Sequence, residues 1–188
     1  MSHLVLVMTL TLPIMQGNDQ DQFFQELAKQ QASLLNKLNQ AQLWSDASKE
    51  DELLNVLQRC KKLKDAAFVP ILIEHVTYEI RDKIRKTSLR TIEEACPVVD
   101  VLQEIGLPAV PRLIELLKRE YPKEAKSDQT LIVGCLIGIY ERPLEKGKRP
   151  AASGLPMARR RIELEVERSK GKEKLHLEDA LKNYLFRD

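Results

Sequence analysis

Cysteine and histidine, the side chains best suited to metal chemistry, are few and widely separated in this chain. Three of each occur, at positions Cys60, Cys96, Cys135, His3, His75 and His176. A tetrahedral metal site needs several such donors, commonly including a CxxC pair, and the sequence contains no CxxC pair. The spacing therefore predicts no metal site. The three cysteines lie in apolar helical contexts, so we expect them to be small, unreactive core residues.

The usual local signatures of an enzyme active site are also missing from the sequence. The chain has no GxSxG, no phosphate-binding GxxxxGK[ST], no GxGxxG and no HExxH. His75 follows Glu74 on a predicted amphipathic helix, where a single histidine is more often a packed or surface side chain than a general base. We therefore expect no catalytic residue, no cofactor and no small-molecule substrate.

A basic run near the C-terminus has the composition of a nucleic-acid contact. Arg159, Arg160 and Arg161 are consecutive, but three glutamates follow at once, and no aromatic residue occurs between Tyr140 and Tyr184 to stack on bases. The whole chain carries 30 Lys and Arg against 28 Asp and Glu, a formal charge of only +2. We interpret the run as a solvated helix face, and nucleic-acid contact through Arg159–Arg161 as an alternative.

The N-terminus combines an apolar run, Leu4–Met15, with a polar stretch directly after it. The run has the length of the hydrophobic region of a signal peptide, about 7 to 15 residues, and is short for a transmembrane helix, which needs about 20. No Lys or Arg precedes Lys29, and no clean small-x-small pair precedes Gly17. We expect residues 1–17 to be a signal peptide, with an apolar arm packed on the core as the alternative. An exported or periplasmic location is accordingly favoured over a cytoplasmic one.

The elements that would position these side chains are helices. Apolar residues recur three and four apart, and the low glycine, proline and aromatic content is typical of one all-α domain. The stretch from Asn18, with no Gly or Pro before Asp65, predicts one long amphipathic helix that ends near Trp44. Ser48 with Asp51 three residues later resembles a capping box, which predicts the start of a second helix.

Two segments of the chain repeat nearly the same nine letters. Residues 68–76 read FVPILIEHV and residues 109–117 read AVPRLIELL, 41 positions later. Each carries an apolar stripe at helical spacing: Val69, Leu72, Ile73 and Val76, and then Val110, Leu113, Ile114 and Leu117. A proline, Pro70 or Pro111, falls in the first turn of each predicted helix. Asp65 is the expected N-cap of the first copy, and Gly106 is expected to end the helix before the second.

These residues resemble the HEAT-repeat (armadillo-like) family. VVDVLQEIGLPAVPRLIELLK, Val98–Lys118, is similar to the second helix of one HEAT repeat followed by the first helix of the next, and LKDAAFVPILIEHV is a weaker copy. The period of 41 lies within the family's range of about 40 to 47. The resemblance covers roughly Glu50–Tyr140 and implies a short, irregular α-solenoid of stacked helical hairpins. It implies a noncatalytic scaffold or adaptor that mediates protein–protein interaction. Residues 78–96 depart from the pattern by supplying an additional charged helix.

Some HEAT-like families are enzymes, and their motifs offer a comparison. Deoxyhypusine hydroxylases carry repeated His-Glu dipeptides, and this chain has none. Alkylpurine DNA glycosylases use an aromatic and acidic cleft, whereas the sole tryptophan here, Trp44, precedes the repeats. Bilin lyases have weaker signatures, so a HEAT-like lyase or enzyme-associated subunit is the alternative function.

The remaining divisions follow from composition. The HEAT-like domain is expected to span residues 18–140 and to end with Leu131–Tyr140, an apolar helix that is buried but too short to cross a membrane. Gly134 and Gly138 on this helix are expected to let neighbouring helices approach closely. A Pro- and Gly-rich linker is expected over residues 141–157, followed by C-terminal helices over residues 158–188.

Overall fold

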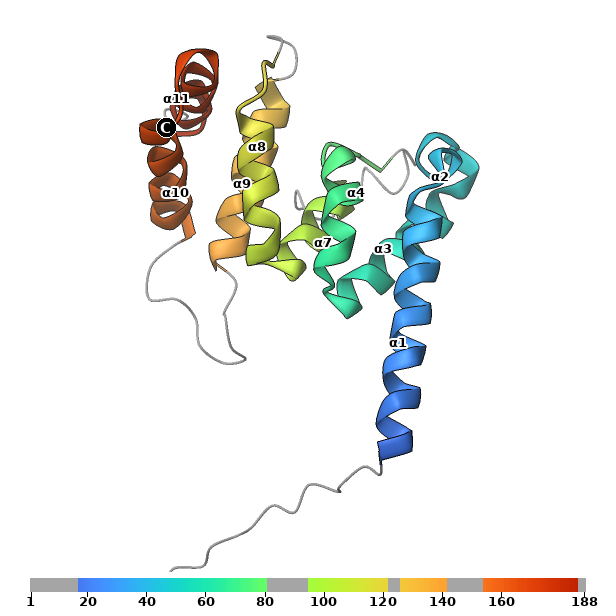
Figure 1. Cartoon of the computed structure of the whole chain (residues 1–188). Coiled ribbons are helices and arrows are strands. Elements are labelled where there is room, and N and C mark those ends of the chain that lie inside the picture. Colours follow the sequence, from blue (N-terminus) through green and yellow to red (C-terminus); the bar gives the residue numbers. More distant parts are fainter. Residues whose placement is uncertain (1–16, 81–94, 122–125, 142–153, 186–188) are drawn as a thin grey trace, which may run out of the picture. The chain divides into compact units, whose positions relative to one another are not determined.

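A computed structural model describes residues 17–80, 95–121, 126–141 and 154–185 (Figure 1). All regular secondary structure within these ranges is helical, which confirms the all-α prediction. The expected signal peptide, most of the charged helix over residues 78–96 and most of the linker lie outside the described residues. The chain divides into two compact units, residues 1–33 and 34–188. Within the part that the structure describes, no helix has the length and apolarity needed to cross a membrane.

The predicted long first helix is in fact two helices, so the expectation of one helix ending near Trp44 was wrong. Helix α1 (Gly17–Leu38) ends at Leu38, and α2 (Ala41–Ser45) begins after an extended Gln40. The side-chain amide of Asn39 donates to the carbonyl of Leu35 at 2.9 Å, and the Trp44 indole N–H donates to the carbonyl of Leu38 at 2.8 Å. The last carbonyls of a helix have no backbone N–H partner within the helix. Here the side chains of Asn39 and Trp44 donate to two of these carbonyls, so α1 can end at Leu38.

The first half of α1, which belongs to the first compact unit, is largely exposed. Its Phe23 and Phe24 are 57% and 64% exposed, and their rings meet edge to face with centroids 5.9 Å apart. In the second unit, Leu34 and Leu38 of the same helix are buried. The apolar stripe predicted for this helix is therefore buried only in its last turns.

The start of the next helix also differs from the prediction. A 3-10 turn, η1 (Ala47–Lys49), precedes α3 (Glu50–Leu63), and the capping side chain is Asp46 rather than Ser48. Asp46 Oδ1 accepts from the Ser48 backbone N–H at 2.9 Å and from its hydroxyl at 2.7 Å. Ser48 lies within η1 and Lys49 is the N-cap of α3, so Ser48 is not at the N-cap position that the predicted capping box requires. The first turn of α3 carries Glu50, Asp51 and Glu52, and the helix dipole favours negative charge at this end.

The two copies of the nine-residue segment begin with the same local structure. A 3-10 turn, η2 (Ala66–Phe68) or η3 (Leu107–Ala109), leads directly into helix α4 (Val69–Glu74) or α8 (Val110–Leu117). Phe68 and Ala109, 41 positions apart, have φ/ψ of −78°/−21° and −79°/−23°. Val69 and Val110 have −53°/−47° and −54°/−48°. The two copies therefore follow the same backbone path where the helix begins, but α4 ends at Glu74, whereas α8 continues to Leu117.

The turns before the two copies differ in their chemistry. Before η2, Lys64 is left-handed with φ 53°, and Asp65 accepts from the Ala67 N–H at 2.8 Å, as its N-cap role predicts. Before η3, Gly106 alone ends α7 (Pro97–Ile105), with φ 80° and ψ −139°. This backbone conformation is favourable only for glycine, so the predicted helix stop at Gly106 is confirmed.

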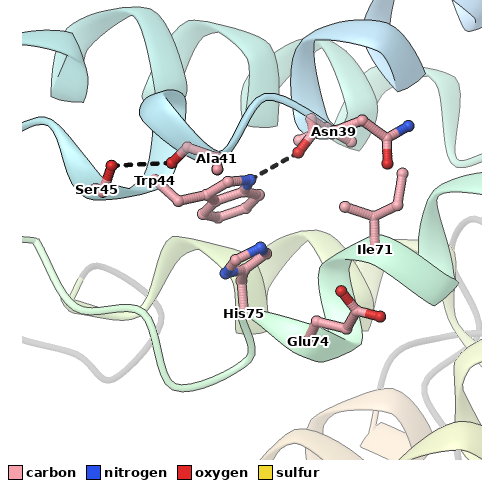
Figure 2. A pocket seen from close by; sticks show the side chains of 8 residues that line it. Asn39, Ala41, Trp44, Ser45, Ile71, Glu74 and His75 are labelled. Atoms are coloured by element: carbon pink, nitrogen blue, oxygen red, sulfur yellow. Dashed lines mark hydrogen bonds between the residues drawn. The ribbon is translucent and has the colours of Figure 1, made fainter.

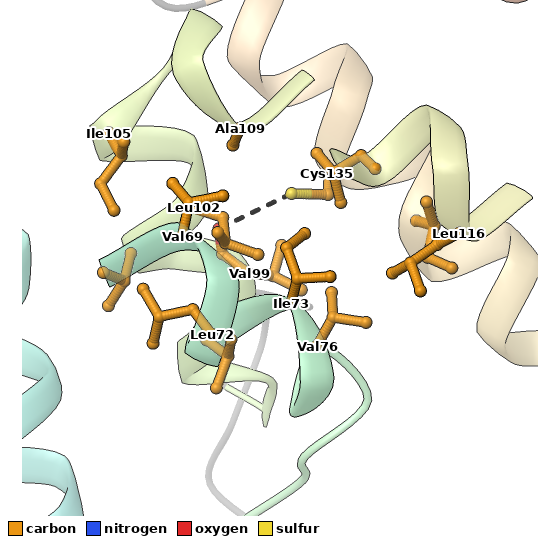
Figure 3. Packing of buried hydrophobic residues seen from close by; sticks show 14 of the residues in the cluster. Val69, Leu72, Ile73, Val76, Val99, Leu102, Ile105, Ala109, Leu116 and Cys135 are labelled. Atoms are coloured by element: carbon orange, nitrogen blue, oxygen red, sulfur yellow. Dashed lines mark hydrogen bonds between the residues drawn. The ribbon is translucent and has the colours of Figure 1, made fainter. Parts of the chain in front are cut away.

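Helix α7 packs against both α3 and α4, and α4 also contacts α8. Two ion pairs join α3 to α7: Lys61 Nζ lies 2.6 Å from Asp100 Oδ2, and Lys64 Nζ lies 2.7 Å from Glu104 Oε2. These partners are 39 and 40 positions apart, close to the sequence period. Figure 3 shows the apolar stripe of α4 facing Val99 and Leu102 of α7. All eight residues of the two predicted stripes are buried.

Helix α9 (Lys126–Glu141) contacts α7, α8, α10 (Gly154–Arg168) and α11 (Gly171–Leu185). Most side chains of Leu131–Tyr140 are buried, which confirms the prediction of a buried helix. A Cβ at Gly138 would collide with the buried side chain of Gln103 on α7, whereas a Cβ at Gly134 would have nothing within 4 Å. The expected close approach therefore occurs at Gly138 only. The chain resumes its helix at Gly154, four residues before the expected start of the C-terminal helices.

The three cysteines are buried, as predicted. Cys60, Cys96 and Cys135 are each at most 5% exposed, and Cys135 Sγ donates to the carbonyl of Val99 at 3.9 Å (Figure 3). Burial raises the pKa of the Cys60 thiol to about 12, against a smaller opposing effect of Arg59. At neutral pH the Cys60 thiol is therefore protonated and a poor nucleophile.

The burial of the second stripe leads to a prediction for Leu113, which is 0% exposed. Replacing Leu113 by Ala should lower the free energy of unfolding by about 2–5 kcal/mol, because it removes buried methyl groups and leaves a cavity. Its neighbour Arg112 is exposed, and Arg112→Ala should change stability by less than about 0.5 kcal/mol. Urea denaturation of both variants measures the difference. Equal stabilities would contradict the packing of α8.

Gly154 and Gly134 form a second matched pair. A Cβ at Gly154 would strike the carbonyl of Ile137 and lie 2.8 Å from the backbone N of Glu141, and this helical backbone of α9 cannot move independently of the helix. Gly154→Ala should therefore destabilise by about 1–3 kcal/mol. Gly134→Ala meets open space inside a helix and should stabilise by about 0.5–1 kcal/mol. Thermal denaturation should show shifts of opposite sign, and a stabilising Gly154→Ala would contradict the close packing of α9 and α10.

Candidate functional site: a pocket beside Trp44 and His75

A pocket of about 410 Å³ lies between the α1–α2 connection and the C-terminal end of α4 (Figure 2). Its lining consists of Leu38, Asn39, Ala41, Trp44, Ser45, Ile71, Glu74 and His75. Leu38 and Trp44 are buried, whereas Asn39 and Glu74 are exposed. The pocket therefore has an apolar floor and a polar rim.

A stacked pair of rings forms one side of this pocket. The indole of Trp44 and the imidazole of His75 have centroids 3.8 Å apart and planes 10° from parallel. The ring of Tyr78 meets Trp44 edge on, with centroids 5.7 Å apart, and its hydroxyl donates to Glu50 Oε2 at 3.4 Å. The indole N–H is held by the carbonyl of Leu38, so the end of α1 fixes the orientation of the stack.

Burial determines the protonation of His75. Desolvation lowers the pKa of its imidazole, and the adjacent Glu74 carboxylate opposes this effect only in part. Because the ordinary imidazole pKa is about 6.5, His75 is neutral at pH 7. A neutral imidazole carries one N–H donor and one acceptor nitrogen.

The rim offers mainly hydrogen-bond acceptors. The Asn39 amide nitrogen donates to the carbonyl of Leu35, which leaves the amide oxygen available to the pocket. The Ser45 hydroxyl donates to the carbonyl of Ala41 at 3.0 Å. Glu74 adds a carboxylate and forms no ion pair with any residue in the described ranges. These groups are suited to a ligand that carries hydrogen-bond donors and positive charge.

Among the described residues, neither a hydrogen-bonded acid–base pair nor a metal-ligand cluster accompanies the pocket. Glu74 and His75 are consecutive, but no hydrogen bond in the described part of the chain links His75 to a nucleophile or to a carboxylate that would orient it. No set of three or more His, Cys, Asp or Glu side chains with metal-site geometry occurs among the described residues. The three buried cysteines do not line the pocket.

The second sequence candidate, Arg159–Arg161, forms ion pairs along α10. Arg159 Nε lies 2.8 Å from Glu163 Oε1, Arg160 Nη1 lies 3.7 Å from Glu167 Oε1, and Arg161 Nη2 lies 2.9 Å from Glu165 Oε1. Glutamates one turn or more along the helix therefore accompany each arginine, as expected for a solvated helix face.

In the sequence, Trp44 and His75 were each interpreted as residues without a catalytic role, and the structure stacks their rings. A difference between the two copies of the nine-residue segment points to His75. At the spacing of 41, His75 corresponds to Leu116, which is buried, and Thr77 corresponds to Lys118. The first copy therefore replaces a core leucine by a histidine and lacks the lysine that pairs with Glu115 in the second.

No family model, curated protein or solved structure matches the chain. The functional argument therefore depends on the geometry of the pocket and of the helices around it.

The lowered pKa of His75 leads to a pH prediction. Between the folded pKa and the ordinary value the unfolded chain binds more protons, so the contribution of neutral His75 to stability is complete above about pH 6.5 and is lost as the pH falls. His75→Phe keeps an aromatic ring on Trp44 but cannot be protonated. From about pH 7.5 to about pH 5, the wild-type protein should therefore lose stability relative to His75→Phe. Urea denaturation across this range measures the difference, and parallel pH profiles would contradict the buried, neutral imidazole.

Proposed function

We propose that this protein is a noncatalytic adaptor, a short HEAT-like α-solenoid that binds another protein. The observation that carries the proposal is the equivalent start of the two segments η2–α4 and η3–α8. The pairs Phe68/Ala109 and Val69/Val110, each 41 positions apart, have φ and ψ within a few degrees of each other. Each segment follows a longer helix, α3 or α7, across a short turn, so α4 and α8 hold equivalent places in two helix–turn–helix segments.

The contacts between these two helix–turn–helix segments support their stacking in register. Helix α3 contacts α7, and α4 contacts α8, so the helices before the two turns meet and the helices after them meet. The Lys61–Asp100 and Lys64–Glu104 pairs advance in the same direction along α3 and α7, as parallel neighbours require. Stacked units of this kind typically function by presenting an extended surface to a partner.

The pocket supports binding over catalysis. It combines an aromatic wall, an apolar floor and an acceptor rim. It lies where α4 ends, in the helix–turn–helix segment formed by α3 and α4. The lyase alternative receives less support, because the described rim lacks a hydrogen-bonded acid–base pair. Nucleic-acid contact through Arg159–Arg161 also receives less support, because the glutamates of α10 lie beside all three guanidinium groups.

Affinity capture from the native organism, followed by reconstitution of purified components, tests the proposal. The tagged chain should retain at least one protein that an unrelated tagged helical protein does not, and the purified pair should bind with a defined stoichiometry in calorimetry. Both exported and intracellular fractions should be used. Retention that depends on nucleic acid, or the absence of any protein that binds after purification, would contradict the adaptor function.

A further inference from the structure

We propose that the Trp44–His75 pocket receives an arginine side chain of the protein partner. This inference depends on the proposed function, because it names what the adaptor recognises. It arises from a comparison of equivalent positions in the two copies of the repeat, in which the same glutamate has different surroundings.

In the second copy the glutamate is neutralised within the chain. Glu115 Oε1 lies 2.8 Å from Lys118 Nζ, and this hydrogen bond is the largest of the effects that raise the pKa of the lysine. Lys118 also lies 3.5 Å from Glu165 Oε2, which ties α8 to α10. In this copy the carboxylate is exposed but has a lysine of the same chain beside it.

In the first copy the corresponding carboxylate faces a pocket and has no cation beside it within the described residues. Glu74 lines the pocket, and Thr77 stands where the second copy has Lys118. His75 is half-buried against Trp44, whereas its counterpart Leu116 is 6% exposed in the core. The first copy therefore lines a cavity at this position, and among the described residues no cation lies beside its carboxylate.

The hydrogen-bonding capacity of the pocket specifies the charge of its ligand. The Asn39 amide nitrogen donates one N–H to Leu35, so Asn39 offers its oxygen and one further N–H, and Glu74 offers two acceptor oxygens. Lys37, in the last turn of α1, is already paired with Glu52 at 2.7 Å. A ligand with several N–H donors and one positive charge complements this rim, and an anionic ligand does not.

The shape of the pocket favours arginine over lysine. A guanidinium group is planar, presents forked donors that match a carboxylate, and packs against apolar and aromatic surfaces. Figure 2 shows acceptors contributed from two elements, Asn39 at the α1–α2 connection and Glu74 on α4, with Ile71 also lining the pocket. The ammonium group of lysine is more strongly hydrated and carries its donors on a single nitrogen, so it matches separated acceptors less well.

The test uses the fluorescence of Trp44, the only tryptophan in the chain, which reports directly on the pocket. The full-length protein is titrated with the peptide acetyl-Gly-Arg-Gly-amide and with the same peptide carrying citrulline, which keeps the shape and removes the charge. The arginine peptide should produce a saturable change and bind about tenfold more tightly than the citrulline peptide, as expected for a charge-assisted hydrogen bond.

Two matched variants show whether the arginine peptide binds in the pocket or elsewhere on the surface. Glu74→Gln should weaken the arginine peptide about tenfold, whereas Glu115→Gln, the same substitution at the equivalent position of the second copy, should leave its affinity unchanged. Circular dichroism and thermal denaturation confirm that both variants fold. Equal affinity for the two peptides, an unchanged affinity in Glu74→Gln, or no saturable change with the arginine peptide would overturn the inference.

The outcome can be separated from a failure of the adaptor function. If affinity capture yields a partner and the Glu74→Gln variant retains it as strongly as Glu115→Gln does, the adaptor function stands and the arginine pocket is wrong. If no protein partner is found by capture, the adaptor function itself is wrong, whatever the peptides show.

Discussion

The packing of α4 against α7 and α8 is the interaction on which the rest of the structure depends. It buries the stripe of Val69, Leu72, Ile73 and Val76, and α7 in turn packs on α3 and α9. Because α4 is only one and a half turns long, its position is set by these contacts and by the 3-10 turn before it rather than by its own helical stability. The place where α4 ends fixes Glu74 and His75, and therefore fixes the pocket.

Much of this core was predictable from sequence because it depends on periodicity and on local turn chemistry. The stripes at Val69–Val76 and Val110–Leu117, the N-cap Asp65 and the helix stop at Gly106 each follow from short-range rules, and the structure confirms them. The break between α1 and α2 was not predictable in this way. It depends on the contact of the Trp44 indole with the Leu38 carbonyl, and no glycine or proline marks it in the sequence.

The pocket was harder to predict for a similar physical reason. Trp44 and His75 belong to different helices, and only tertiary packing brings their rings to 3.8 Å. The residues next to a single histidine on an amphipathic helix do not show which distant side chain it will contact. The signal that was present is a difference between repeats: His75 in place of buried Leu116, and Thr77 in place of Lys118. When the two copies are compared position by position, a residue that breaks the shared packing pattern, such as His75, marks the place where a site can form.

Site-specific photocrosslinking in the native cell tests the central claim, that the Trp44–His75 pocket is a protein-binding site, most directly. A photoreactive amino acid at Gln42, which is exposed on α2 beside the pocket, samples what lies over it, and the same amino acid at exposed Arg112 on α8 is the control. The account predicts a crosslink to another polypeptide at Gln42 that exceeds any crosslink at Arg112. Absence of a polypeptide crosslink at Gln42, or equal crosslinking at the two positions, would contradict it.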